Sequence, residues 1–332
     1  MSGNGGTDWK AVLMPEFEVR KSRAQKTAFI GMLAERFGDR MRVETCGSLV
    51  KSRNIVIGDP ETAKIIYTAH YDTCARLPVP NFITPRNIPI FLLYQVVISL
   101  LFAVPLFVLT FLAAWLGRGL PDLAGLFVTE GVLILGFAGI LWVFFGGVPN
   151  PHTANDNTSG VVTVLTLADR LEGSSDAAFI LFDNEEIGLL GSTGYAAAHK
   201  NIRDGTLLVN FDCVSDGPHF LILFSKDAMK RPYYENLRSR AASLFGNADG
   251  KREDGDPARR VCEIRSKKGS VYPSDQAAFR VSAAVCALNE SKTFGLYMDK
   301  IHTPKDTVFD PGNIAALAEL FAGAHEGEAR LS

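Results

Sequence analysis

Two long apolar stretches constrain the fold of this chain more than any other feature of its sequence. Residues 88–116 contain no charged side chain, and residues 123–148 contain only Glu130. The stretches are 29 and 26 residues long, whereas an α-helix needs roughly 20 apolar residues to cross a bilayer. Soluble helices of this length usually carry a polar stripe, and neither stretch has one. We therefore predict an inserted two-helix transmembrane hairpin over residues 87–148 that contacts the lipid bilayer, in preference to a pair of buried helices or a subunit interface.

The remainder, residues 1–86 and 149–332, alternates between apolar runs typical of buried strands and helical patterns. The predicted strands cover residues 42–45, 54–57, 65–68, 178–182, 207–211 and 220–224. The predicted helices cover residues 17–37, 159–171 with Ser159 as the N-cap, and 188–199. This alternation predicts an α/β fold with a mostly parallel central sheet flanked by helices on both faces. Because the hairpin interrupts it, the predicted catalytic domain is discontinuous.

The composition argues against nucleic acid as a partner and against an oxidising compartment. With a formal net charge of −2 and 21% charged residues, the chain has no basic surface suited to nucleic acid. Its five cysteines are scattered without a C-x-x-C pair, which is typical of reduced, buried thiols rather than a disulfide framework. The N-terminal segment 1–10 has no apolar run behind a basic stretch, so we expect no cleavable secretion signal.

Arginines near the hairpin indicate which side of the membrane the domain occupies. Arg76 and Arg86 precede the first apolar stretch, and the cytoplasmic flanks of membrane helices are enriched in arginine and lysine. Arg118, in the turn between the two stretches, would lie on the opposite side of the membrane and so reduces the difference in positive charge between the two sides. Two crossings return the chain to the side from which it started. We therefore expect a two-helix membrane protein with its catalytic domain in the cytoplasm, while the sequence leaves its oligomeric state open.

Five short segments carry side chains that are typical of metal ligands. They read T-A-H-Y-D-T around His70, A-N-D-N-T-S-G around Asp156, D-N-E-E-I-G at 183–188, N-F-D-C around Asp212 and I-H-T-P-K-D-T around His302. Each segment alone has a structural explanation, such as a turn or a solvated helix start. His70, the Glu185–Glu186 pair and Asp212 all follow predicted strands, where ligand sites gather in open α/β sheets. Two imidazoles, three carboxylates and a spare glutamate suffice to hold two zinc ions and leave a base free, so the set predicts a metallohydrolase.

With these motifs in this order, the chain outside residues 86–148 resembles the M28 zinc peptidases, the co-catalytic aminopeptidase group. The resemblance implies a zinc-exopeptidase-like fold and two zinc ions per chain. His70 and Asp212 would bind one ion, Glu186 and His302 would bind the other, and Asp156 would bridge the two. The implied activity is removal of N-terminal residues from peptide substrates.

The same resemblance implies the remaining roles around the site. Glu185 would be the general base, which takes the proton of the attacking water and passes it to the leaving amine. Asp72, two residues after His70, would orient the imidazole of that ligand. The peptide bond between Asp156 and Asn157 would be cis, a feature that family members share.

One segment departs from the family pattern, and two other functions stay open. The stretch S-D-Q-A-A-F at 274–279 has Gln276 where the family commonly has a histidine, which concerns the substrate pocket rather than the metal ligands. Tyr272, just upstream, either hydrogen-bonds the reaction oxyanion or packs as an ordinary aromatic. The alternatives are a glutaminyl cyclase-like acyltransferase, which typically works with one zinc, and a membrane-anchored, non-catalytic peptide-binding protein. The complete set of ligands and base favours the aminopeptidase.

Overall fold

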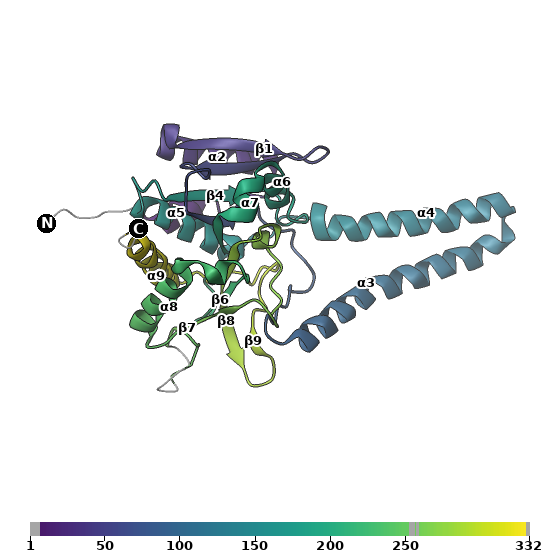
Figure 1. The fold of residues 1–332 in the computed structure, drawn as a ribbon. Coiled ribbons are helices and arrows are strands. Elements are labelled where there is room, and N and C mark those ends of the chain that lie inside the picture. The colour runs from purple at the N-terminus through teal and green to yellow at the C-terminus, as the bar shows by residue number, and fades with distance from the viewer. Residues whose placement is uncertain (1–6, 252–255, 257–258, 330–332) are drawn as a thin grey trace.

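The computed structural model describes residues 7–251, 256 and 259–329, and within them nine strands form one sheet (Figure 1). The first six residues of the N-terminal segment discussed above lie outside the described residues. The strands are β1 (Met41–Cys46), β2 (Ser52–Ile57), β3 (Ile65–His70), β4 (Ala177–Phe182), β5 (Leu207–Phe211), β6 (His219–Phe224), β7 (Val261–Ser266), β8 (Ser282–Ser291) and β9 (Gly295–Tyr297). Strands from before and after the hairpin therefore share one sheet.

The order of the strands is β1-β2-β4-β3-β5-β8-β6-β7, and β9 pairs with β8. Strands β4, β3, β5 and β8 are parallel neighbours in the centre. Antiparallel pairs lie on both sides of them, between β1, β2 and β4 and between β8 and β6. The predicted fold class is confirmed, and the antiparallel pairs make the sheet mixed.

Helices cover both faces of the sheet. They are α1 (Trp9–Glu16), α2 (Arg23–Phe37), α5 (Gly160–Arg170), α6 (Leu190–Ala198), α7 (Lys200–Gly205), α8 (Pro232–Phe245) and α9 (Pro311–Ala329). Neighbouring side chains of a strand point to opposite faces. Tyr67 of β3 accordingly packs in the larger core with residues of α2, α5, α8 and α9, while Ile66 packs in a second core with Tyr195 of α6 and Ile202 of α7.

One helix start and the role of one capping side chain differ from those predicted from the sequence. The helix predicted from residue 17 begins at Arg23, because Ser22 and Gln25 form a capping box there, with N–H···O distances of 3.2 and 2.8 Å. Ser159 stands at the N-cap position of α5, as predicted, but its side chain makes no cap hydrogen bond. Its hydroxyl instead donates to the carbonyl of Asn155 at 2.7 Å and accepts from the N–H of Val214 at 3.0 Å. Helices α1, α7, α8 and α9 and strands β7, β8 and β9 lie outside the predicted elements.

The two apolar stretches form helices that project from the body of the molecule (Figure 1). Helix α3 spans Ile88–Leu116, and α4 spans Asp122–Leu141 and continues as a wider turn over Trp142–Gly146. The two helices contact each other, with the rings of Phe102 and Phe144 at 4.9 Å. Most of their other side chains face outward, and Phe107 is 71% exposed. Both helices are long and apolar enough to cross a membrane, and they are not part of the core of this chain.

The base of the hairpin is fixed to the body by the main chain. Ala75 and Pro149 form an isolated β-bridge, and the N–H of Arg76 donates to the carbonyl of Val148 at 2.8 Å. The chain thus leaves the sheet after β3 and returns beside the same segment. Residues next to the hairpin base consequently lie close to the end of β3, which is also the end that carries His70.

Candidate metal centre

The structure brings the five predicted ligands and the predicted base together at one edge of the sheet. His70 is the last residue of β3, Glu185 and Glu186 follow β4, and Asp212 follows β5. Because β4, β3 and β5 are adjacent and parallel, their carboxyl ends meet at this edge. Asp156 and His302 reach the same place from loops, which lie before α5 and after β9.

The carboxylate of Asp156 lies between the two histidines. Its Oδ1 is 3.3 Å from Nε2 of His70, and its Oδ2 is 3.1 Å from Nε2 of His302. Asp212 lies on the first side, with Oδ1 at 3.5 Å from the same nitrogen of His70. Glu186 lies on the second side, with Oε2 at 3.3 Å from Nε2 of His302. His70 and Asp212 therefore lie at one end of the Asp156 carboxylate, and His302 and Glu186 lie at the other. A carboxylate that bridges two metal ions requires this arrangement.

Asp72 lies beside His70 but contacts its ring through the main chain. Nδ1 of His70 is 3.1 Å from the carbonyl oxygen of Asp72 and 3.7 Å from the carboxylate. The carboxylate instead accepts the N–H groups of Glu185 and Glu186 at 3.0 and 3.2 Å. Asp72 thus fixes the orientation of His70 with its carbonyl and the position of the two glutamates with its side chain.

Buried polar side chains hold the segment around Asp156, and the sequence reading had not singled them out. Asp306 accepts the N–H groups of Asn155 and Asp156 at 2.9 and 3.0 Å. Asn157 Oδ1 accepts the N–H of Cys213 at 3.2 Å, which ties the segment to the residue after Asp212. The bond between Asp156 and Asn157 is cis, as predicted. The available signal was the pair of asparagines that flank Asp156, since buried amides need several partners.

Tyr272 and Gln276 form hydrogen bonds that hold the chain around Asp212. The hydroxyl of Tyr272 donates to the main-chain carbonyl of Asp212 at 2.9 Å, and its ring packs in a buried cluster. Gln276 donates to the carbonyl of Tyr272 at 2.7 Å and accepts from Asn210 at 3.1 Å. Of the two roles considered for Tyr272, this geometry favours the packed aromatic.

Burial and the charges of neighbouring groups shift the pKa values of the acidic side chains of the site. Burial, followed by the charge of Asp156, raises the pKa of Glu186 well above its ordinary value. Burial and the neighbouring Glu186 also raise the pKa of Glu185, against the effect of His70. Burial alone would raise the pKa of Asp156 too, but hydrogen bonds from His302 and His70 hold it below its ordinary value. The site therefore concentrates more negative charge than its histidines neutralise.

This excess charge and the donor types suit two divalent cations. Asp156, Glu185, Glu186 and Asp212 together carry −4 when ionised, and the ion pairs they form within the described part of the chain are with His70 and His302. Oε1 of Glu186 is buried without a hydrogen-bond partner. Imidazole nitrogen and carboxylate oxygen are both ordinary zinc ligands. The residues present thus fit a pair of zinc ions.

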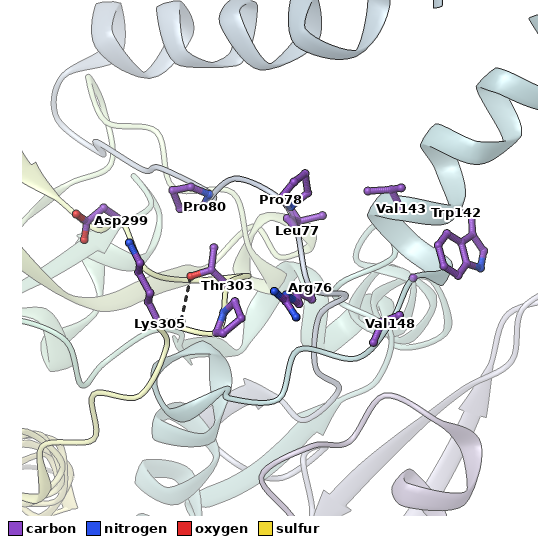
Figure 2. A pocket seen from close by; sticks show the side chains of 12 residues that line it. Arg76, Leu77, Pro78, Pro80, Trp142, Val143, Val148, Asp299, Thr303 and Lys305 are labelled. Atoms are coloured by element: carbon purple, nitrogen blue, oxygen red, sulfur yellow. Dashed lines mark hydrogen bonds between the residues drawn. The ribbon is translucent and has the colours of Figure 1, made fainter. Parts of the chain in front are cut away.

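Two cavities flank the site, and the base of the hairpin lines both. The larger, of about 700 Å³, lies between residues 76–80, 142–148 and 299–305, and so borders the loop of His302 (Figure 2). The smaller, of about 420 Å³, is lined by Glu186 and Asp72 together with residues 145–147. Apolar side chains such as Trp142 and charged ones such as Lys305 share the wall of the larger cavity.

Comparisons with known proteins agree with this architecture. The family model of peptidase family M28 matches residues 144–324. LapA aminopeptidase of Legionella pneumophila superposes with a TM-score of 0.50 at 14% identity, over 96% of this chain and 69% of that chain, which is a likeness of fold. A zinc aminopeptidase of Bacillus subtilis gives 0.44 at 17% identity, over 84% and 50%. A glutaminyl cyclase of Fimbriiglobus ruber gives 0.46 at 14% identity, over 92% and 88%. Comparison with curated protein sequences gives no match.

Proposed function

Because the chain belongs to peptidase family M28, we propose that it is a zinc-dependent aminopeptidase that removes N-terminal residues from peptides. In this proposal His70 and Asp212 hold one zinc ion, Glu186 and His302 hold the other, and Asp156 bridges them. The observation that carries the proposal is the position of Asp156, whose two oxygens lie 3.3 and 3.1 Å from different histidines. A single-metal site would not need a second donor set on the far side of this carboxylate.

Glu185 is the general base of the proposed reaction. It is not needed as a ligand, and its N–H is fixed by Asp72 at 3.0 Å. Its carboxylate oxygen lies within 4.8 Å of the donor atoms of His70 and Glu186. Bound zinc would polarise the scissile carbonyl and lower the pKa of the attacking water. Glu185 accepts the proton of that water and delivers it to the leaving amine, a role that its raised pKa favours.

The substrate chain would occupy the cavities beside the metal centre. The larger one offers apolar walls from Leu77, Trp142 and Val143, together with the charges of Arg76 and Lys305. A mixed wall of this kind suits a peptide, which presents apolar side chains and polar main-chain groups at once. The N-terminal residue would lie nearest the metal centre, and the rest of the peptide would extend past the hairpin base.

A substrate panel tests this proposal against the two alternatives. Purified protein in detergent is incubated with aminoacyl chromogenic substrates and with a peptide that begins with glutamine, and bound zinc is counted in the same preparation. We expect release of the N-terminal residue by protein that holds two zinc ions per chain, and loss of this activity on chelation. Cyclisation of the glutamine peptide by protein with one zinc would identify a glutaminyl cyclase. Binding of peptides without turnover would identify a binding protein.

We further propose that α3 and α4 anchor the enzyme in a bilayer. Their outward side chains are apolar along both helices, as in Leu93 at 62% and Leu135 at 74% exposure. Single soluble monomers rarely expose contiguous apolar surface of this extent. At about 1.5 Å per residue, α3 is about 43 Å long, which exceeds the roughly 30 Å of a hydrocarbon core and allows a tilt. Arg76 and Arg86, at the hairpin base, favour a cytoplasmic catalytic domain.

Replacement of residues 88–141 with a flexible Gly/Ser linker should yield a soluble protein that still binds two zinc ions. Residues 142–148 are kept because they line both cavities. The measurement is ultracentrifugal fractionation of cell lysates, followed by metal analysis of the soluble fraction. Full-length protein is the control, and we expect it to sediment with membranes and to need detergent for extraction. A full-length monomer that is soluble without detergent would contradict the anchor, and a soluble oligomer would indicate that the hairpin is a subunit interface.

A further inference from the structure

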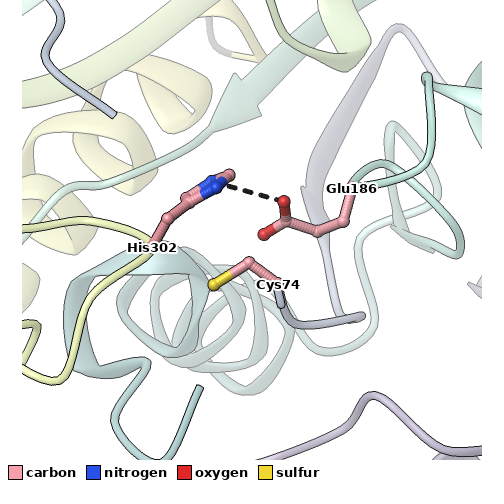
Figure 3. Close-up of side chains that lie close together, drawn as sticks. All are labelled: Cys74, Glu186 and His302. Atoms are coloured by element: carbon pink, nitrogen blue, oxygen red, sulfur yellow. Dashed lines mark ion pairs between the residues drawn. The ribbon is translucent and has the colours of Figure 1, made fainter. Parts of the chain in front are cut away.

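A third side chain borders the metal position on the His302 side. Cys74 lies four residues after His70 and is 1% exposed. Its Sγ, a ring nitrogen of His302 and a carboxylate oxygen of Glu186 all lie within 4.8 Å of one another. The three side chains come from separate segments and lie close together (Figure 3). The proposed aminopeptidase chemistry does not use this thiol.

An independent observation indicates that this space suits a cation. Oε2 of Glu186 is 3.3 Å from His302, but Oε1 is buried and has no hydrogen-bond partner among the residues that the structure describes. The side chain of Glu186 is only 6% exposed, so water from the surface does not readily satisfy this oxygen. A buried anionic oxygen without a donor is costly unless a positive charge compensates it. Figure 3 shows that the second oxygen is directed toward the side where Cys74 lies.

The main chain holds Cys74 in this position. Its carbonyl accepts the N–H of Asn150 at 3.2 Å, and the next residue, Ala75, forms the β-bridge to Pro149. The second cysteine near the site differs, because Sγ of Cys213 already donates to Oδ1 of Asp212 at 3.2 Å. Cys74 is therefore fixed by the hairpin base and faces the metal position, whereas Cys213 is engaged with a carboxylate.

We propose that Cys74 is a thiolate ligand of the metal ion on the His302 side. The proposal rests on the two-metal centre proposed above. When the metal binds, a sulfur–metal bond forms and the thiol proton passes to solvent. The ion on this side then has four protein donors, from Cys74, Asp156, Glu186 and His302.

This assignment makes the two metal positions unequal. Four protein donors complete a tetrahedral zinc site, whereas a position with three protein donors keeps one open for water or substrate. The other ion, held by His70, Asp156 and Asp212, has three such donors and therefore carries the open position. The carboxylate of Glu185 lies within 4.8 Å of donor atoms of both His70, at the open position, and Glu186, at the closed one. The thiolate also makes the closed position selective for zinc, cadmium or cobalt. Magnesium and manganese are harder ions and prefer oxygen ligands.

Cobalt substitution tests the sulfur ligand without reference to activity. Full-length protein in detergent is stripped of metal under reducing conditions, reloaded with Co²⁺ and analysed for cobalt content. Coordination of a thiolate to Co²⁺ produces a sulfur-to-cobalt charge-transfer absorption in the near ultraviolet. We expect this absorption in the wild-type protein when it holds two cobalt ions per chain. Two cobalt ions without the absorption would overturn the assignment of Cys74 and leave the proposed two-metal function intact.

Variants identify which cysteine is responsible. Cys74→Ser should lose the charge-transfer absorption. It should also release one of its two ions at a chelator concentration at least about 10–100 times lower than the wild type requires. Changes of this size are typical even when a residue that only contacts a metal ligand is replaced. Cys213→Ser, which changes the neighbouring buried thiol, should keep both the absorption and the affinity. Persistence of the absorption in Cys74→Ser, or its loss in Cys213→Ser alone, would contradict the proposal. Failure of wild-type protein to bind cobalt or zinc would reject both this inference and the proposed function. Absence of the absorption from wild-type protein with two cobalt ions overturns the proposal whether or not a variant folds.

Discussion

Replacement of Glu185 with glutamine is expected to leave both zinc ions bound and to abolish nearly all turnover. The amide keeps the shape of the side chain but cannot accept a proton from the attacking water. General-base catalysis contributes roughly 10²–10⁴-fold to rate, so kcat should fall by about this factor. The N–H of Glu185 donates to Asp72 at 3.0 Å through the main chain, and this hydrogen bond persists in the variant. The measurements are kcat on the best substrate of the panel and the zinc content of the same protein.

The adjacent glutamate provides the matched comparison. Glu186→Gln changes the same group by the same chemistry, but Glu186 faces His302 at 3.3 Å as a proposed ligand. We expect this variant to lose metal from the His302 side first and to lose activity as a consequence. Near-normal turnover in a Glu185→Gln protein with two zinc ions would show that another group takes the proton. Loss of metal from Glu185→Gln would instead show that Glu185 is a ligand.

Replacement of Asp156 with alanine should remove both metal ions. Its two oxygens lie 3.3 Å from His70 and 3.1 Å from His302, so the substitution deletes one donor from each set. It also removes one of the negative charges that make the buried site favourable for cations. We expect elemental analysis of dialysed protein to find zinc far below two ions per chain, and peptidase activity to be lost with it.

Asp216→Ala is the control for this substitution. Asp216 is also a buried aspartate, 5% exposed, but its carboxylate pairs with Lys300 at 2.9 Å. This variant should retain two zinc ions, and thermal unfolding followed by circular dichroism shows whether each variant is folded. Full occupancy in a folded Asp156→Ala protein would eliminate Asp156 as a ligand. Retention of one ion would show that Asp156 serves a single metal rather than a bridge.

Local patterns were sufficient for the hairpin and for the strands that carry the site. The uncharged stretch 88–116 coincides with α3, because a long, mainly apolar run can satisfy its main-chain hydrogen bonds within itself as a helix. Strands β3, β4 and β5 were found because residues buried on both faces give continuous apolar runs. The start of α2 was placed too early, because the capping box at Ser22 is a weaker signal than the apolar residues before it.

Without the structure, the sequence already showed which residue types were available for chemistry and that several of them follow predicted strands. Their order along the chain also resembled one family closely enough to suggest a role for each of them. Three contacts of the site could not be read from the sequence. The oxygens of Asp156 face two different histidines, Asp306 holds the main chain of that segment, and Cys74 lies beside Glu186 and His302. The site brings together residues up to 232 positions apart, from His70 to His302 (302 − 70), each of which contacts Asp156. Local propensity determines the strands that end at the site, but the direction of a loop side chain depends on long-range hydrogen bonds and packing, which one segment of sequence does not encode.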